Sequence, residues 1–504
     1  MTIRFGTDGW RAVIADGYTF DRVRAAARGM ARYVQWEGRE NLTVYARHGE
    51  EGGYPAPWRA AARGLVVGYD TRFLSARFAA AVAEEVAAMG VPVLLSDTFA
   101  PTPAISLAIR DWQTAGAIIV TASHNPPEYN GLKFKPEYAS SGMPEVMDAI
   151  IPFVHEELAR ATAPRETPAA ITHFSPLDGY RKQLTDLVDL GRIARSDLDV
   201  VVDPMHGAGV GVVRSLLPGV REVRATPDPT FGGYNPEPID RNLPPLREAL
   251  RNSPRNAPES MRIGIATDGD ADRIGAMDGT GHFFNSHEIF AILLWHLVTR
   301  KGWGGGVVKT FSTSNMIGTL ARHFGLPVYE TPIGFKYIVE NMLNHDILIG
   351  GEESGGIGIR NHIPERDGVL SGLLLLEAAA WENESVAQVL ERVHAITGAC
   401  TYDRVDLHLP SREQMAGVVE QLQKTPPRTI GGSDVQGVET SDGVKFLLEN
   451  NAWILFRPSG TEPVLRVYVE APTRNEVRDI LEDGEQMALR GAGATARTAG
   501  VRTA

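Results

Sequence analysis

The stretch AGAIIVTASHNP, residues 115–126, changes abruptly from apolar to polar. Its first half has the composition of a strand that is buried on both faces, as in a parallel sheet. Its second half, TASHNP, brings a hydroxyl group, an imidazole and an amide to the end of that strand, where open parallel sheets bind their ligands. Ser, Asn and Pro are also ordinary turn residues, so a plain turn is enough to explain this loop when it is taken alone.

Apolar runs of the same kind recur along the chain and alternate with helical patterns. The β-rich runs GLVVGYD (64–70) and VPVLLSD (91–97) lie on either side of an Ala-rich amphipathic segment, residues 78–89. This alternation is typical of parallel α/β units. Similar orders run from residue 198 to 270 and from 305 to 356. We therefore expect three successive α/β domains.

The pattern changes after about residue 398. The β-runs VKFLLEN, AWILFRPSG and VLRVYVEAP follow one another closely before a helical segment, residues 474–489, which is typical of a small α+β domain with an antiparallel sheet. The Pro- and Ala-rich segment 159–172 is expected to link the first two domains. The predicted organisation is α/β domain I, residues 1–160; α/β domain II, 173–282; α/β domain III, 283–397; α+β domain IV, 398–490; and a disordered tail, 491–504.

Composition and charge exclude several classes of function. The 504 residues carry 50 Lys+Arg against 62 Asp+Glu, a net charge of −12, which disfavours a general nucleic-acid binder. Cys400 is the single cysteine, so one chain can build neither a disulfide framework nor a thiolate zinc site. The opening MTIRFGTDGWR lacks the apolar core of a signal peptide, and the apolar run IFAILLWHLV is too short to span a bilayer. We expect a cytoplasmic protein without a membrane partner, as a monomer or homodimer.

The segment DGDADR follows the apolar run RIGIAT and places three carboxylates at alternate positions. Asp268, Asp270 and Asp272 would repel one another unless a divalent cation lay among them. An EF-hand calcium loop begins in the same way, but it needs Gly at its sixth position and Glu at its twelfth, which here are Arg273 and Gly279. Magnesium suits the segment better, because few carboxylates and a substrate phosphate usually hold it. A solvated acidic turn is the alternative.

Two further polar loops lie nearer the C-terminus. In GEESGG, Glu352 and Ser354 stand two residues apart and can hydrogen-bond to adjacent hydroxyl groups of a sugar. In RPSGTEP, a guanidinium fork, two hydroxyl groups and a glycine suit a phosphate group. An exposed acidic turn and a plain hairpin loop are the alternatives. The residues of the expected phosphate site are Arg457, Ser459, Gly460 and Thr461.

Taken together and in this order, the loops TASHNP, DGDADR, GEESG and RPSGTEP resemble those of the α-D-phosphohexomutase superfamily (phosphoglucomutase/phosphomannomutase). The resemblance covers nearly the whole chain. It implies an enzyme that interconverts hexose 1-phosphates and 6-phosphates. It also implies three related α/β domains with mixed sheets and a smaller α+β C-terminal domain around a central cleft.

The resemblance implies roles for individual residues. Ser123 matches the phosphoserine, which with Asp268, Asp270 and Asp272 would bind Mg²⁺. Cations beside the transferring phosphoryl group would be Arg11, in the opening FGTDGWR, Lys133, in NGLKF, and Arg273. The substrate-binding residues would be Glu352 and Ser354 for the sugar, Arg457, Ser459, Gly460 and Thr461 for the distal phosphate, and Lys336.

The implied reaction passes through a hexose 1,6-bisphosphate, which is also expected as an activator. Phosphorylated Ser123 would donate its phosphoryl group to the free sugar hydroxyl, and Mg²⁺ would neutralise the charge that develops. The bisphosphate would then turn end for end and return its other phosphate. The general base is open between Lys133 and His124, and His124 alternatively only orders the loop.

The sequence leaves the substrate open between glucose and mannose phosphates. The sugar loop ends in Gly355-Gly356, where several mannose- and glucosamine-type relatives have Gly-His. TPIGFK (331–336) and HIPERDG (362–368) are similar instead to glucose-type relatives. We expect interconversion of glucose 1-phosphate and glucose 6-phosphate, with phosphomannomutase or dual activity as the alternative.

Other functions fit the sequence less well. A Ser-His-Asp esterase would need a G-x-S-x-G elbow, which the chain lacks. A dinucleotide site could be sought in DPMHGAGVG, but Val212 stands where the third glycine of the fingerprint belongs. A catalytically silent sugar-phosphate-binding protein and a metal-dependent phosphatase remain as alternatives, although the presence of all the reactive side chains argues against the silent protein.

Overall fold

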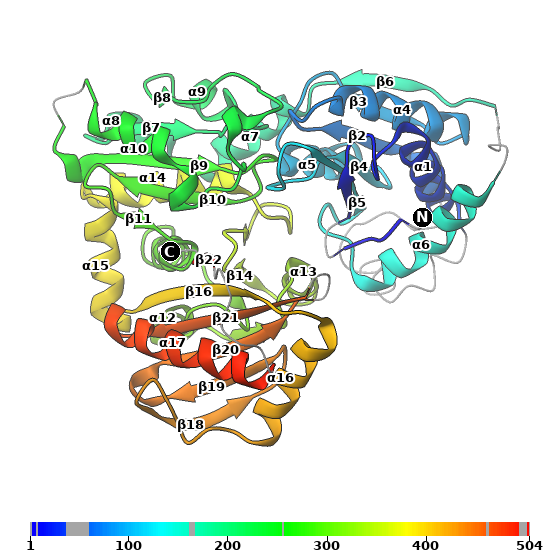
Figure 1. The fold of residues 1–504 in the computed structure, drawn as a ribbon. Coiled ribbons are helices and arrows are strands. Elements are labelled where there is room, and N and C mark those ends of the chain that lie inside the picture. The colour runs from blue at the N-terminus through cyan, green and yellow to red at the C-terminus, as the bar shows by residue number, and fades with distance from the viewer. Residues whose placement is uncertain are drawn as a thin grey trace. The chain divides into compact units, whose positions relative to one another are not determined.

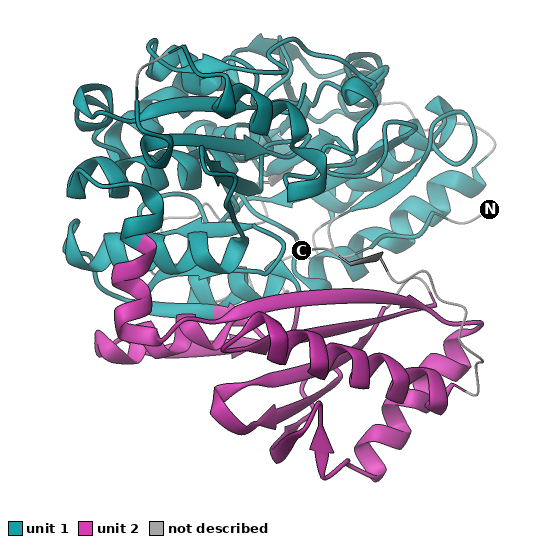
Figure 2. Ribbon diagram, turned by 60° about the vertical axis from the view of Figure 1, so that its left-hand side comes forward, with its two compact units in different colours: residues 1–308, 334–389 teal, residues 309–333, 390–504 magenta. Residues whose placement is uncertain are grey.

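The computed structural model describes residues 3–6, 9–36, 60–160, 167–254, 257–459, 463–492 and 501–502. The chain forms two compact units, which Figure 2 colours separately. Unit 1 comprises Met1–Val308 and Gly334–Val389, and unit 2 comprises Lys309–Ile333 and Leu390–Ala504. Among the described residues, no helix combines the length and the apolar character that a membrane crossing requires.

The first sheet of unit 1 contains the strand that ends at TASHNP. In spatial order its strands are β1 (Trp10–Val13), β5 (Tyr129–Pro136), β4 (Gly116–Val120), β2 (Leu65–Tyr69), β3 (Val93–Ser96) and β6 (Ile171–Phe174) (Figure 1). The last four strands are mutually parallel, whereas β5 is antiparallel to both of its neighbours. The expected linker, 159–172, therefore overlaps the beginning of β6.

Helices cover both faces of this sheet. On one face the apolar core includes α1 (Phe20–Gln35), α4 (Ser75–Ala88) and α6 (Pro144–Ala159), which pack against one another or the sheet. On the other face lies α5 (Thr102–Trp112), where Gly68 of β2 leaves room for Ile105. The short helix α3 (Ala60–Arg63) precedes β2. β2 and β4 are thus buried on both faces, and a polar loop follows the end of each strand.

The second sheet carries the acidic loop. Its strands in spatial order are β11 (Phe283–Phe284), β10 (Ile274–Asp278), β9 (Arg262–Thr267), β7 (Asp199–Asp203) and β8 (Arg221–Glu222). β7 is parallel to β8 and β9, while β10 returns antiparallel to β9, so that DGDADR is the turn between them. The helices of this region are α7 (Pro176–Leu187), α8 (Leu190–Arg195), α9 (Val212–Leu216), α10 (Pro244–Arg251), η3 (Phe231–Gly233), η4 (Asp240–Asn242) and η5 (Glu259–Met261).

The third sheet has the spatial order β13 (Val328–Thr331), β12 (Gly306–Thr310), β14 (Ile347–Gly351) and β15 (Ile357–Ile359). GEESGG joins β14 to its antiparallel partner β15. The apolar run IFAILLWHLV lies in α11 (Ser286–Thr299), which packs against the equally buried α14 (Gly368–Glu382). The remaining helices of this part of the chain are α12 (Asn315–His323), α13 (Phe335–Asn344) and α15 (Val386–Thr397).

Unit 2 contains an antiparallel sheet with the order β17 (Thr429–Ile430), β18 (Ser433–Glu439), β19 (Val444–Leu448), β20 (Trp453–Pro458), β21 (Val464–Ala471), β16 (Thr401–His408) and β22 (Val501–Arg502). Helices α16 (Arg412–Lys424) and α17 (Arg474–Gly491) pack on one face. The short helix η6 (Glu449–Asn451) precedes β20. On β20 the side chains alternate: Ile454 and Phe456 join the helices' core, whereas Trp453 and Leu455 pack on the other face with Phe311.

The fold class expected from the sequence is confirmed, with mixed α/β sheets in three regions and an antiparallel sheet at the C-terminal end. The predicted domain boundaries stay predictions. Most of the expected tail, 491–504, lies outside the described residues, but two of its residues form β22 beside β16.

Candidate active site

The serine loop begins where β4 ends. Thr121 organises its first turn: the backbone N–H of Ser123 donates to Thr121 Oγ1 at 2.9 Å, and Thr121 Oγ1 donates to Asp70 Oδ2 at 2.6 Å. Ser123 is 1% exposed and has φ 51°, in the left-handed region that residues with a side chain rarely adopt. Such a conformation persists only where the surroundings hold it, so the direction of Ser123 Oγ is fixed by this loop.

Arg72, three residues after the end of β2, supports the loop and was not predicted from the sequence. Its guanidinium is buried and donates to four carbonyl oxygens of the loop, those of Ser123 (2.7 Å), Asn125, Pro126 (2.8 Å) and Tyr129 (2.9 Å). A buried guanidinium needs such acceptors, and here they come from the loop that it orders. The signal that could have revealed Arg72 is its place in GYDTR, directly after an apolar strand.

The acidic loop lies against the serine loop. Asp268, Asp270 and Asp272 are buried, and one ligand oxygen of each lies within 4.8 Å of the others. Gly269 makes the close approach possible, because a Cβ at this position would lie 2.5 Å from the carbonyl oxygen of Ser123. A side chain at residue 269 would therefore push the two loops apart.

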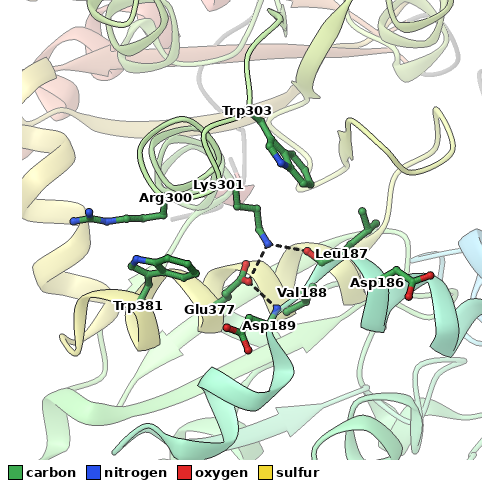
Figure 3. A pocket seen from close by; sticks show the side chains of 9 residues that line it. All are labelled: Asp186, Leu187, Val188, Asp189, Arg300, Lys301, Trp303, Glu377 and Trp381. Carbon is green, nitrogen blue, oxygen red and sulfur yellow. Dashed lines mark hydrogen bonds and ion pairs between the residues drawn. The ribbon is translucent and has the colours of Figure 1, made fainter.

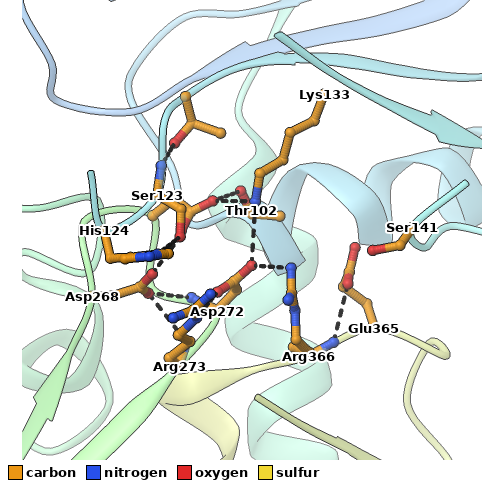
Figure 4. A network of polar contacts seen from close by, with 12 residues as sticks. Thr102, Ser123, His124, Lys133, Ser141, Asp268, Asp272, Arg273, Glu365 and Arg366 are labelled. Atoms are coloured by element: carbon orange, nitrogen blue, oxygen red, sulfur yellow. Dashed lines mark hydrogen bonds and ion pairs between the residues drawn. The ribbon is translucent and has the colours of Figure 1, made fainter. Parts of the chain in front are cut away.

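Ser123 and Asp268 join the two loops directly. Ser123 Oγ donates to Asp268 Oδ2 at 2.8 Å, and Asp268 Oδ1 accepts from the backbone N–H groups of Asp272 (2.9 Å) and Arg273 (3.2 Å). Figure 4 shows these side chains turned towards one another from both loops. The structure thus brings together the serine and the aspartates that the sequence singled out from positions far apart.

The donor set fits a small divalent cation. Asp270 Oδ1 and Asp272 Oδ1 are buried and accept no hydrogen bond from any residue that the structure describes. A buried carboxylate oxygen that accepts no hydrogen bond is unfavourable, and hard oxygen ligands of this kind are those that Mg²⁺ prefers. The three carboxylates and Ser123 Oγ could therefore hold such an ion.

Basic side chains surround the aspartates. Lys133 on β5 is 1% exposed, and its Nζ lies 2.9 Å from Asp270 Oδ2 and 3.3 Å from Asp272 Oδ2. Arg273 Nε lies 3.8 Å from Asp272 Oδ1. These cations offset part of the negative charge that the acidic loop concentrates.

Three more residues complete this environment. Thr102 Oγ1 at the start of α5 donates to Asp270 Oδ2 at 2.8 Å. Arg11 on β1 donates to Asn125 Oδ1 of the serine loop at 2.6 Å. Arg366 Nη2 donates to Asp272 Oδ2 at 2.7 Å. Thr102 and Arg366 were given no role from the sequence, although Arg366 lies in HIPERDG, because their acidic partners are far away along the chain.

The aspartates differ in how readily they are protonated. Burial raises the pKa of Asp268 well above its ordinary value, and the charges of Asp270 and Asp272 raise it further. Burial acts in the same direction on Asp270, but the ammonium of Lys133 and the hydrogen bonds from Lys133 and Thr102 outweigh it and lower the pKa of Asp270. Asp268, which faces Ser123, is therefore the carboxyl group that most needs a nearby cation in order to stay ionised.

His124 follows the serine and has an unusual ionisation. Burial lowers its pKa well below 6.5, and the charges of Arg273 and Arg11 lower it further. The imidazole is therefore neutral at pH 7. Its Nδ1 lies 3.4 Å from Ser123 Oγ (Figure 4). The ring can consequently accept a proton there, although only as a weak base.

The expected sugar-reading residues lie in the turn between β14 and β15. Ser354 Oγ lies 3.5 Å from Glu352 Oε2, and burial raises the pKa of Glu352 to about 7, although the charge of Arg366 opposes this shift. Lys336 on α13 places its ammonium 5.1 Å from the centroid of the Tyr337 ring. No hydrogen bond or ion pair joins Lys336 to the Ser123 and aspartate cluster within the described residues.

The expected phosphate loop belongs to unit 2. Arg457 on β20 donates through Nε to Asp442 Oδ2 at 3.1 Å, and the same oxygen accepts from the backbone N–H of Ile333 at 2.8 Å. The backbone N–H of Ser459 donates to the carbonyl oxygen of Val464 at 2.8 Å, as in a hairpin. Gly460 and Thr461 lie outside the described residues. The approach of this loop to the Ser123 cluster stays a prediction.

A separate pocket of about 440 Å³ is lined by none of the predicted site residues (Figure 3). Its buried carboxylate, Glu377, is already engaged: Oε1 accepts from Lys301 Nζ at 2.9 Å and from the backbone N–H of Asp189 at 2.7 Å, and Oε2 lies 2.9 Å from His296 Nε2. Because these charged groups bind one another, we assign this pocket no ligand. Its lining residues are Asp186, Leu187, Val188, Asp189, Arg300, Lys301, Trp303, Glu377 and Trp381.

Models of known protein families match most of the chain. Models of four phosphoglucomutase/phosphomannomutase domains match in order: alpha/beta/alpha domain I at residues 54–161, domain II at 178–281, domain III at 285–396 and the C-terminal domain at 410–485. This chain belongs to the phosphoglucomutase/phosphomannomutase family. It is accordingly an enzyme, a phosphohexomutase, as the four loops implied.

Individual relatives of this phosphohexomutase carry different substrate names. A phosphoglucomutase/phosphomannomutase from Thermococcus kodakarensis is 29% identical over 95% of this chain and 97% of its own. A phosphoglucosamine mutase from Methanocaldococcus jannaschii is 28% identical over 83% of this chain and 90% of its own. Among solved structures, a "putative phosphomannomutase" from Thermus thermophilus has 36% sequence identity to this chain. The match covers 97% of this chain and 99% of the Thermus chain, with a TM-score of 0.79. The family is thus clear, whereas the sugar has to be argued from the site.

Proposed function

We propose that this phosphohexomutase interconverts glucose 1-phosphate and glucose 6-phosphate through phosphorylated Ser123 and a hexose 1,6-bisphosphate. The observation that carries the proposal is the 2.8 Å hydrogen bond from Ser123 Oγ to Asp268 Oδ2 beside the buried aspartates. A phosphoryl group on Ser123 would add between one and two negative charges to this acidic site. Such a group is tolerated only where a cation binds, and the neighbouring loop supplies the ligands.

Asp268, Asp270 and Asp272, together with Ser123, would hold Mg²⁺. When bound there, the ion would neutralise charge on the oxygens of the transferring phosphoryl group. Lys133, whose ammonium is already in place against two of the carboxylates, adds fixed positive charge. Charges that are preorganised in a buried site stabilise a transition state without having to rearrange.

In the first transfer the free hydroxyl oxygen of the sugar phosphate attacks the phosphorus atom, and the bond from phosphorus to Ser123 Oγ breaks. The hydroxyl proton passes to a basic side chain, for which Lys133 and His124 are the two candidates. The same side chain can return that proton to Ser123 Oγ, which leaves as an alkoxide. His124 is neutral at pH 7 and can accept the proton directly. Lys133 would first have to lose its proton, which the two carboxylates beside its ammonium oppose.

In this proposal Arg457, Ser459, Gly460 and Thr461 hold the phosphate that is already on the sugar. Glu352 and Ser354 would bind sugar hydroxyl groups near the middle of the ring, which either orientation of the bisphosphate can present, and Lys336 would also bind the substrate. After the bisphosphate turns end for end, its other phosphate returns to Ser123. This exchange requires the protein to move around the bisphosphate, and such a movement limits turnover in many enzymes.

Gly356 favours glucose as the sugar, because the loop lacks the imidazole that the resemblance gives to several mannose- and glucosamine-type relatives at this point. Phosphomannomutase or dual activity is the second candidate, since the 36% identical Thermus protein carries that name. The two sugars differ in the configuration of one hydroxyl group, for which a pocket gives only modest discrimination unless it binds that group specifically.

A panel of substrates and one variant test the proposal. Wild-type enzyme with Mg²⁺ and a trace of hexose 1,6-bisphosphate is assayed on the 1-phosphates of glucose, mannose and glucosamine, and we expect the highest kcat/KM on glucose 1-phosphate. Ser123→Ala should lower turnover by at least about a thousandfold, the scale of losing a covalent nucleophile, while sugar-phosphate binding survives. Unchanged turnover in Ser123→Ala would refute the mechanism, and equal efficiency on glucose and mannose would refute the substrate preference.

A further inference from the structure

Arg366 lies where two loops of the site meet, and neither the sequence nor the family resemblance gave it a role. Its side chain is 6% exposed. Nη2 donates to Asp272 Oδ2 of the acidic loop at 2.7 Å, and Nη1 lies 3.6 Å from Glu352 Oε2 of the sugar loop. We propose that Arg366 is a positioning residue that fixes the sugar-reading carboxylate of Glu352 relative to Asp272. The proposal rests on the proposed function.

The chemistry of the guanidinium suits this task. Two buried carboxylates from separate loops repel each other, and a planar fork with several N–H donors can hold both at a fixed separation. The guanidinium carbon also lies 5.2 Å from the centroid of the Phe335 ring, which limits its rotation. A single ammonium group offers a point charge without this fixed geometry.

The residue before Arg366 anchors it to the strand that carries Lys133. Glu365 Oε2 lies 2.5 Å from Lys135 Nζ, and both side chains are fully buried. Lys133 and Lys135 are two residues apart on β5, so their side chains leave the same face of the strand. The ammonium of Lys133 reaches the aspartates (Figure 4), and the ammonium of Lys135 reaches Glu365. The strand β5 therefore holds both the residue next to Arg366, through Lys135, and the acidic loop, through Lys133.

Gly356 supplies the space that the stem of Arg366 occupies. A Cβ at residue 356 would lie 2.3 Å from Cδ and 2.9 Å from Cγ of Arg366. These distances are shorter than any tolerated contact, so a side chain at 356 would force the arginine to move. The two positions are thus coupled: alanine at 356 should be harmful only while Arg366 is present.

A double-mutant cycle tests this coupling. The variants Arg366→Ala, Arg366→Lys, Gly356→Ala and Gly356→Ala/Arg366→Ala are compared with wild type for kcat, KM and the Kd of glucose 1-phosphate. We expect Arg366→Ala and Gly356→Ala each to raise KM and Kd about tenfold, the usual loss of one charged hydrogen bond, with a smaller change in kcat. Arg366→Lys should recover part of the loss. In the Arg366→Ala background, Gly356→Ala should cost less than about twofold.

Matched controls separate positioning from general damage. Arg360 pairs with Asp346 at 2.7 Å, and a Cβ at Gly304 would meet nothing within 4 Å. Arg360→Ala and Gly304→Ala should therefore leave KM and Kd unchanged, and far-UV circular dichroism reports folding of every variant. If Arg366→Ala does not fold, Gly356→Ala and Arg366→Lys still carry the test.

Three results would overturn the proposal: KM and Kd within about twofold of wild type in Arg366→Ala, no effect of Gly356→Ala, or equal effects of Gly356→Ala in both backgrounds, since independent sites add. The Kd values do not depend on turnover. A wild-type protein that binds glucose 1-phosphate without converting it would therefore contradict the proposed function and still leave the role of Arg366 measurable.

Discussion

Burial raises the pKa of Glu352 from 4.5 to about 7, against the opposing charge of Arg366. The folded protein then keeps a proton that the unfolded chain releases near pH 4.5. The stabilisation linked to this proton is complete below pH 4.5 and is lost as the pH rises to about 7. Glutamine stays neutral at every pH. We therefore expect Glu352→Gln to increase the free energy of unfolding more at pH 8 than at pH 4.5, by roughly 3 kcal/mol. Urea denaturation at the two pH values measures this, and equal effects at both would contradict the shift.

Gly269 offers a direct test of the contact between the serine and acidic loops. In Gly269→Ala the new Cβ would lie 2.5 Å from Ser123 O, so the loops must separate. A displacement of about 1 Å in a reacting group can cost about a hundredfold in rate, and we expect kcat to fall by this order. Steady-state kinetics measure the loss. Gly417→Ala, where a Cβ meets nothing within 4 Å, is the control; similar kcat values in both variants would show that the contact does not matter.

Sequence patterns predicted those candidate residues that stand close together in one short segment. Three aspartates at alternate positions are enough to predict a cation site, whatever the rest of the chain contains. Arg72 and Arg366 carry no such local mark, because their acceptors lie far away in the sequence: Arg72 binds carbonyl oxygens of the serine loop, and Arg366 binds Asp272. Only the folded backbone shows that these arginines are buried and what they hold.

The N-terminus of α11 links helix stability to the sugar loop. Asn285 Oδ1 accepts from the backbone N–H of Glu288 at 3.1 Å, and Glu288 Oε2 accepts from the backbone N–H of Asn285 at 2.9 Å. The next residue, Ser286, donates to the carbonyl oxygen of Glu353 beside Glu352. We expect Asn285→Ala to cost about 1 kcal/mol of stability, the usual value for an N-cap, and to raise KM for the sugar phosphate.

The corresponding capping box of α17, formed by Thr473 and Glu476 in unit 2, is the matched control. Thr473→Ala should cost about as much stability, again roughly 1 kcal/mol, without changing KM. Thermal unfolding and initial rates of the two variants make the comparison. A rise in KM in both variants, or in neither, would show that the start of α11 does not act on the sugar loop.

Among the elements, buried parallel strands were the easiest to predict. Each of these strands, β2, β4, β7 and β9, contains a nearly continuous apolar run. Such runs are typical of strands that are buried on both faces. β5 was not predicted as a strand, although it is almost entirely buried. Its lysines suggest a surface loop until their buried carboxylate partners are known. Tertiary pairing of charges thus overrides the local polarity of this strand.

Mg²⁺ should stabilise the folded protein against heat. All four expected ligands, Ser123 and the three aspartates, are buried side chains of unit 1. A ligand at a hundredfold excess over its Kd stabilises the native state by about 2.7 kcal/mol. We expect calorimetry to show an unfolding transition that moves up in temperature with Mg²⁺ and down with EDTA. Asp270→Ala should abolish the shift, and a wild-type transition that does not respond to Mg²⁺ would contradict the metal site.

Regular alternation of apolar runs and helices was enough to predict the class and number of the domains, because it records local burial. It could not show that residues 309–333 fold with unit 2, since these residues continue the α/β pattern of the preceding sequence. That assignment depends on packing between distant segments, such as Phe311 with Trp453.

The burial of Phe311 against Trp453, Leu455 and Tyr468 has a consequence for how the protein is made. During synthesis on the ribosome, Phe311 is translated long before these three residues. The side chain of Phe311 therefore lacks these packing partners until residues 453–468 have been made. A shortened gene that starts near residue 398 would reverse the problem, because its product would present the three partners to solvent and tend to aggregate. Expression of the C-terminal region alone therefore needs the segment 309–333 supplied as a fusion or as a separate peptide.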